Sequence, residues 1–383
     1  MKATIKTIAT LATMAFATPA IAGGVNVYDD GESKLKIEAL IYANTFSQKD
    51  DSITAAGTTT TKTAGLAIDR AYFTAKYTFN NDWMMRLTTD MGTESALGKD
   101  QNIYLKYAYV EGKLAGKAAV LRVGQSHTPW IDYEQSKWKH RYVAKVLSDQ
   151  YKFDTSADLG LGLKGKIADG MVDYFVTGTN GSGYGKGVRT AGADYNARIG
   201  LHPIDGLDID FQYLTGYHGT KTSVTNVAQS NVKSNLMQAM ISYGTKEFRI
   251  GGNYLVNKDK GTGTKASSEH GGNTTSGALF VTGATGDEVK STAYALWGWA
   301  KIPGTQFGAF GRYENVKNEM SSLGVANANK EKVDRYVAGL EYSPIKNITF
   351  AAVVDSTKLK NIAGVTANQE KDTRFGLYSE IKL

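Results

Sequence analysis

The sequence predicts an all-β protein: a 16-stranded antiparallel transmembrane β-barrel with short periplasmic turns, long extracellular loops and an inward-folded third loop. Apolar and polar residues alternate with a period of two along most of the chain, and short turns alternate with long polar stretches. No apolar run after residue 22 reaches the ~20 residues that a membrane-spanning helix needs. A closed barrel can also cross a bilayer, because every backbone group is then paired between strands.

The chain begins with the pattern of a secretory signal peptide, Met1–Ala22. Lys2 and Lys6 give it a basic start, an apolar stretch covers residues 8–16, and small residues end it at residues 20–22. The alternative, a transmembrane helix, is disfavoured because the apolar stretch is shorter than the ~20 residues that a span requires. We therefore expect a signal peptide at residues 1–22 and a barrel domain at residues 23–383.

Composition limits the chemistry that the chain can carry. Its 383 residues include 44 Lys and Arg, 37 Asp and Glu, five His and no Cys. The missing cysteines exclude disulfides, thiolate zinc sites, iron–sulfur clusters and covalent haem. The histidines show no metal-ligand spacing, and neither a P-loop nor a GxSxG motif is present. The sequence predicts no catalytic residue, metal or cofactor, and no nucleic-acid partner.

Seven tight turns divide the barrel domain into hairpins. Glycine and asparagine tolerate positive φ and proline presets its own φ, so clusters of these residues favour turns. The turns are expected at residues 80–82, 115–117, 168–170, 203–206, 244–247, 303–305 and 343–347.

Eight longer polar stretches separate the hairpins. We expect them at residues 48–64, 92–101, 126–156, 181–190, 218–234, 258–288, 317–333 and 359–372. Fifteen connections imply sixteen strands, and an even number brings both termini to the periplasmic rim. The strands are expected to begin near residues 34, 66, 83, 102, 118, 158, 171, 191, 207, 235, 248, 289, 306, 334, 348 and 373. The alternative fold, two periplasmic β-sandwiches, does not usually keep this alternation of connections.

If the apolar face of each strand faces lipid, the other face carries many charges. A charge facing lipid at mid-bilayer costs ~2–4 kcal/mol, so these charges indicate a water-filled lumen. Four basic residues, Arg70, Arg86, Lys106 and Arg122, fall on strands expected to be neighbours and predict a positive strip on one wall. The alternative is a lumen that is plugged or neutralised by internal ion pairs.

The third long stretch, residues 126–156, is long for a connection without a function. We expect it to fold into the barrel and narrow the pore, with Asp132 and Glu134 across from the basic strip. Opposed charges would create a transverse field that orients polar solutes. The alternative is a loop folded outward over the rim.

The segment that opens this loop, Arg122-Val123-Gly124-Gln125-Ser126-His127-Thr128-Pro129-Trp130, resembles the corresponding stretch of the phosphate-selective porin family and its relatives. The similarity covers roughly residues 34–185. It implies a 16-stranded, usually trimeric barrel whose lumenal basic residues bind anions. The candidates here are Arg70, Arg86, Lys106, Arg122, Lys137, Lys139 and Arg141. The chain ends in Leu383 instead of the phenylalanine common in such barrels.

These observations favour an outer-membrane porin of a Gram-negative cell, a water-filled channel for passive diffusion of small hydrophilic solutes and ions with mild anion preference of the phosphate type. The expected partners are outer-membrane lipid and lipopolysaccharide, the solutes themselves and two further copies in a homotrimer. The alternatives are an adhesin or structural barrel and, from another class, a barrel enzyme such as a lipase or protease, which would need a nucleophile or an acid pair at the rim.

Overall fold

The computed structural model describes residues 24–54, 56–93, 101–181, 183–184, 192–217, 233–260, 263–264, 281–282, 288–322, 325–363 and 366–383. The expected signal peptide lies outside these residues. The expected loops at 92–101, 181–190, 218–234 and 258–288 also lie largely outside them.

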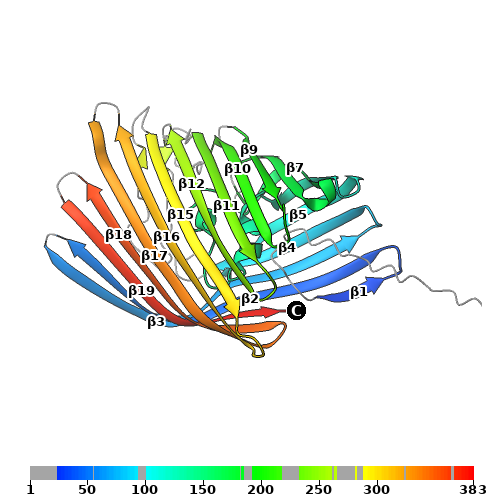
Figure 1. Cartoon of the computed structure of the whole chain (residues 1–383), viewed down its shortest axis with the longest axis horizontal. Coiled ribbons are helices and arrows are strands. Elements are labelled where there is room, and N and C mark those ends of the chain that lie inside the picture. Colours follow the sequence, from blue (N-terminus) through cyan, green and yellow to red (C-terminus); the bar gives the residue numbers. More distant parts are fainter. Residues whose placement is uncertain are drawn as a thin grey trace, which may run out of the picture.

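Sixteen antiparallel strands form one closed barrel (Figure 1). Each strand pairs with the next along the chain, and the last pairs with the first through Ile381 and Ile41, which closes the sheet. The strands are β2 (Lys34–Thr54), β3 (Gly57–Thr78), β4 (Trp83–Thr93), β5 (Gln101–Ala115), β6 (Ala119–His127), β7 (Ala157–Ile167), β8 (Val172–Thr179), β9 (Asp194–Leu201), β10 (Leu207–Tyr217), β11 (Lys233–Gly244), β12 (Phe248–Lys260), β15 (Glu288–Lys301), β16 (Phe307–Ser322), β17 (Val325–Ile345), β18 (Ile348–Ala363) and β19 (Thr366–Lys382). The predicted fold class is confirmed.

Three short strands lie outside the ring of sixteen. The extra strand β1 (Val25–Asp29) pairs with the start of β2. The two-residue strands β13 (Gly263–Thr264) and β14 (Val281–Thr282) pair with each other between β12 and β15.

All seven expected turns join consecutive strands. In the turn between β9 and β10, Gly206 has a φ of 84°, and a Cβ at this position would clash with the carbonyl oxygen of Gly244. Glycine is therefore required there, since other residues rarely adopt this conformation. Most strands begin within three residues of the expected position.

Three of the expected long loops are instead extensions of strands. Residues 48–64, 317–333 and 359–372 belong almost entirely to the hairpins β2–β3, β16–β17 and β18–β19, which project beyond the rest of the barrel at the left of Figure 1. Backbone pairing continues there although apolar and polar residues no longer alternate. Threonine-rich residues 58–63, for example, pair with residues 48–53, and threonine favours strands.

Apolar side chains cover the outside of the barrel. Leu296, Leu340 and Leu377 face outward and are 58, 63 and 61 % exposed, whereas the inward-facing Val337 is 2 % exposed. An exposed apolar surface combined with a charged interior is typical of a barrel that faces lipid. Within the described ranges, no helix is both long and apolar enough to span a membrane.

Candidate pore constriction

The third loop lies inside the barrel. Between β6 and β7 the chain forms helices α1 (Ile131–Trp138) and α2 (Leu147–Gln150), and the loop contacts inward-facing side chains on several sides of the lumen. Asp132 accepts a hydrogen bond from Tyr107 of β5 at 3.0 Å, and Tyr142 packs against Tyr42 of β2. Because these partners point into the lumen, the predicted inward fold is confirmed.

An apolar core holds the loop in place, and the sequence analysis missed it. Trp130, Trp138 and Leu147 of the loop are fully buried and belong to one cluster with inward-facing side chains of the barrel. The Trp138 ring meets the rings of Trp297 and Phe310 edge-on, with centroids 6.1 and 6.0 Å apart. Part of the lumen is therefore filled by packed apolar side chains instead of polar ones.

Polar contacts anchor the same loop to the wall formed by β16 and β17. Tyr151 donates to Glu314 at 3.0 Å, and Nε2 of His140 lies 3.0 Å from Glu341. Glu134 accepts a hydrogen bond from the Trp130 indole at 2.8 Å and lies 3.6 Å from Arg312. The loop is thus fixed to a wall that does not carry the basic strip.

The basic strip occupies neighbouring strands, as expected, and its members differ in their partners. At one end Arg70 pairs with Asp90 at 2.8 Å, and at the other Arg122 pairs with Glu111 at 2.7 Å. Between them lie Arg86 and Lys106. Among the described residues, neither of these two has a carboxylate within ion-pair distance.

Aromatic rings and hydroxyl groups surround the two middle cations. The β4–β5 register shifts next to Lys106, so Lys106 and Tyr107 are both buried although they are consecutive in a strand. Lys106 lies 3.0 Å from the Tyr72 hydroxyl and over the Tyr72 ring, and Arg86 lies over the Tyr107 ring at 4.7 Å. Their positive charges are stabilised by aromatic faces and not by a direct ion pair.

A cavity of about 10 Å³ separates the strip from the third loop, enough for about one water-sized sphere. Its lining consists of Arg86, Lys106, Arg141, Asp132, Gln135, Thr88, Tyr42, Tyr72 and Tyr107. Asp132 is the only carboxylate among these lining residues. Four of the expected site residues, Arg86, Lys106, Asp132 and Arg141, therefore meet at one point.

The remaining loop candidates point elsewhere. Lys137 pairs with Asp208 at 2.8 Å, and Lys139 lies over the Trp299 ring at 3.9 Å. The expectation that Asp132 and Glu134 both lie across from the basic strip was wrong. Asp132 lies against the strip and Glu134 faces Arg312. Residues two apart on a helix are separated by about 200° around its axis, so the two acids face opposite walls.

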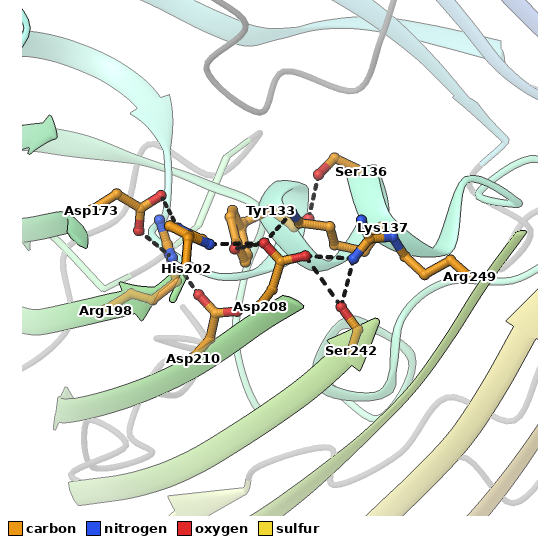
Figure 2. A network of polar contacts seen from close by, with 10 residues as sticks. All are labelled: Tyr133, Ser136, Lys137, Asp173, Arg198, His202, Asp208, Asp210, Ser242 and Arg249. Carbon is orange, nitrogen blue, oxygen red and sulfur yellow. Dashed lines mark hydrogen bonds and ion pairs between the residues drawn. The ribbon is translucent and has the colours of Figure 1, made fainter. Parts of the chain in front are cut away.

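A polar network ties the third loop to a periplasmic turn (Figure 2). Asp208 forms ion pairs with Lys137 of the loop, Arg249 of β12 and His202 of the β9–β10 turn. His202 lies 2.9 Å from Asp208 through Nδ1 and 3.4 Å from Asp173 through Nε2. Hydrogen bonds to Asp173 and Asp208 raise the pKa of His202 to about 9, which favours its doubly protonated form.

We expect His202 to stabilise the fold in a pH-dependent way. Its pKa is raised above the ordinary value of 6.5, so the stabilisation is complete below pH 6.5 and is lost as the pH rises through about 9. The melting temperature of a His202→Leu variant should lie below that of the wild type at pH 6, and the gap should shrink by pH 10. Asp205→Asn, an exposed change in the same turn, should show no such dependence. A gap that is constant with pH would contradict this assignment.

Comparisons with known proteins give matches only among solved structures. No protein-family model and no curated protein matches the sequence. OmpT of Vibrio cholerae, described as outer-membrane expressed, matches with a TM-score of 0.58 and 11 % identity, over 94 % of this chain and 100 % of that one. The anion-selective porin from Comamonas acidovorans matches with a TM-score of 0.58 and 12 % identity, over 92 % of this chain and 100 % of that one. An in-vitro folded trimer form of the Vibrio OmpT matches with a TM-score of 0.51 and 11 % identity, over 90 % and 99 %. At such identities the likeness shows the fold, which is that of porin-type barrels.

Proposed function

We propose that this chain is an outer-membrane porin, a channel for passive diffusion of small hydrophilic solutes and ions, exported with the help of a signal peptide at residues 1–22. The observation that carries the proposal is a closed barrel, apolar outside and charged inside, whose third loop folds into the lumen against a strip of basic residues. The proposal assigns no catalysis to the chain. The structural likeness to the porin from Comamonas acidovorans supports it at the level of the fold.

We further propose a mild preference for anions of the phosphate type. Arg86, Lys106 and Arg141 line the small cavity together with one carboxylate, Asp132, and Arg141 also pairs with Asp149 at 3.4 Å, so Arg86 and Lys106 carry the argument. A site with low-dielectric walls focuses the field of such charges and raises the local concentration of counter-ions. The paired cations at the ends of the strip, Arg70 and Arg122, contribute less because acids already offset their charge.

The proposed assembly is a homotrimer embedded in outer-membrane lipid and lipopolysaccharide. The trimer form of a structurally similar protein supports this stoichiometry by analogy. Chemical crosslinking of the protein in detergent should therefore give a limiting species of three chains.

A structural barrel without conductance is the second candidate, and one observation favours it. The apolar core around Trp138 fills part of the lumen with side chains that exclude water. An adhesin or scaffold would tolerate such a filled lumen, whereas a pore must leave a path beside it.

Single-channel recording in a planar bilayer with a salt gradient separates the two candidates. We expect stable ohmic steps, a reversal potential that favours anions, and partial block of the current by phosphate. Folding is checked first through heat-modifiable migration on gels. Folded protein that gives no steps would overturn the pore and leave the structural barrel, and a cation-favouring potential would overturn the anion preference.

A further inference from the structure

Lysines cover the outside of the barrel near its long-loop end. On the strands β16 to β19, Lys317, Lys332, Lys358, Lys360 and Lys371 form what we call the lysine belt. The residues that follow three of them, Asn318, Val333 and Leu359, are buried in the lumen at 1, 0 and 5 % exposure. Because side chains alternate along a strand, the lysines of the belt point outward.

The sheet register places these like charges directly opposite one another. Lys332 lies between Lys317 on one side and Lys360 on the other, and Lys358 lies opposite Lys371. The pairs Lys258–Lys290 and Lys49–Lys62 repeat the arrangement on either side of the belt. Like charges directly opposite one another on one face of a sheet are destabilising, so bound counter-ions would stabilise this arrangement.

The protein supplies few of those counter-ions. Lys332 pairs with Asp334 at 2.8 Å. Among the described residues, the other four lysines of the belt have no carboxylate within ion-pair distance, although Asp51 of β2 lies opposite Lys371 and Glu319 of β16 pairs with Lys330 on the same outward face. The carboxylates of Glu331, Asp355 and Asp372 belong to the same strands but sit at positions that face the lumen. The positive charge of the belt is therefore directed away from the pore.

The distance of the belt from the short-turn end of the barrel matches the thickness of the apolar layer of a membrane. Phe307 and Tyr342 pack together at the short-turn end, and Tyr313 and Tyr336 pack together further along the same outward face. Lys317 lies about ten residues beyond Phe307, which corresponds to about 25 Å along the barrel axis at the usual rise and tilt of such strands. This equals the height of the apolar band of outer-membrane barrels, so the lysines lie just above the lipid tails.

We propose that the lysine belt binds the phosphate groups of an anionic glycolipid in the outer leaflet. The inference rests on the outer-membrane location proposed above and adds a specific surface and ligand to it. A belt that binds lipid leaves no room for a second copy of this chain on the same wall. The trimer interface should therefore lie on another part of the barrel.

The test uses the refolded full-length barrel and lipid A, the phosphorylated glycolipid anchor, as the probe. The belt variant carries Lys317→Gln, Lys358→Gln and Lys371→Gln, all at exposed positions. The matched control carries Lys117→Gln, Lys246→Gln and Lys346→Gln, three exposed lysines of the short turns. Both variants lose the same charge, and only the first loses it from the belt.

In neutral detergent, the belt variant should melt at a higher temperature than the wild type because repulsion is relieved. Diphosphorylated lipid A should then stabilise the wild type and the control more than the belt variant. Affinity for it should fall about tenfold or more in the belt variant, since each lysine near an anionic surface contributes roughly a fivefold factor. Dephosphorylated lipid A should bind all three proteins equally.

Three results would overturn the inference: equal loss of binding in both variants, equal binding of the two lipids, or the same stabilisation by inorganic phosphate alone. Conductance of the belt variant should match that of the wild type. A protein that conducts but does not bind the lipid phosphates would contradict only this inference. A protein that binds them without conducting would contradict only the proposed pore.

Discussion

Replacing Trp138 by alanine is expected to release the third loop and raise single-channel conductance several-fold. The Trp138 side chain is fully buried, packs against Trp297 and Phe310, and donates to the carbonyl of Ala144 at 3.2 Å. Truncating a buried tryptophan costs about 3–5 kcal/mol of stability, which is large compared with the energy that holds a single loop in place. The backbone pairing of the barrel is unaffected, so the cost falls on the attachment of the loop and the lumen widens.

The measurement compares conductance in planar bilayers after heat-modifiable migration has confirmed a folded barrel. Trp83→Ala is the control, because Trp83 is 41 % exposed at the short-turn rim and its ring lies beside Gly112 of β5. Trp138→Phe should give an intermediate conductance, since it keeps an aromatic ring in the same core. Wild-type conductance in a folded Trp138→Ala barrel would show that the core does not position the loop.

The architecture was predictable because its signals are local. Turn chemistry at residues 203–206, with Gly206 in the left-handed region, marks one end of a hairpin, and alternation then sets which side chains face outward. The expected and observed starts of β4, β10, β12 and β18 coincide for this reason.

The far ends of three hairpins were not predictable by the same signals. Beyond the apolar band the outward face of a strand is polar and the inward face mixes polar and apolar residues, so alternation disappears while backbone pairing continues. Residues 317–333 show this, since Lys317 faces outward while the inward face carries the polar Asn318 and Glu331 beside Val333, all three buried.

The basic wall was predicted and the attachment of the third loop was not. Arg86 and Arg122 follow the alternation of neighbouring strands, so their lumenal position could be inferred. The sequence analysis assigned the apolar residues of each strand to the lipid-facing side, so it could not identify an apolar core inside the lumen. In β15, Leu296 faces outward and Trp297 inward, and this loss of alternation was the available signal.

Neutralising the middle of the basic strip is expected to shift ion selectivity toward cations. The double variant Arg86→Gln and Lys106→Gln removes the two strip cations that have no acidic partner among the described residues, and it leaves Asp132 in place. The interaction energy between a unit charge and a passing ion about 4 Å away is about 1 kcal/mol in bulk water and about 4 kcal/mol near a protein surface. Each replacement should therefore change the ratio of anion to cation permeability by about fivefold or more.

The reversal potential in a salt gradient measures this ratio, and the phosphate concentration for half-block should rise in the same variant. The matched control, Lys117→Gln with Lys246→Gln, removes the same charge from exposed turns and should leave both quantities unchanged. If the two variants shift the potential equally, net charge governs selectivity and the strip has no special role. If the double variant folds and keeps the wild-type potential, ions pass at a distance from Arg86 and Lys106, and the pore must run along another part of the wall. Selectivity would follow the strip only if the passage left beside the third loop runs along β4 and β5, so the double variant also locates that passage.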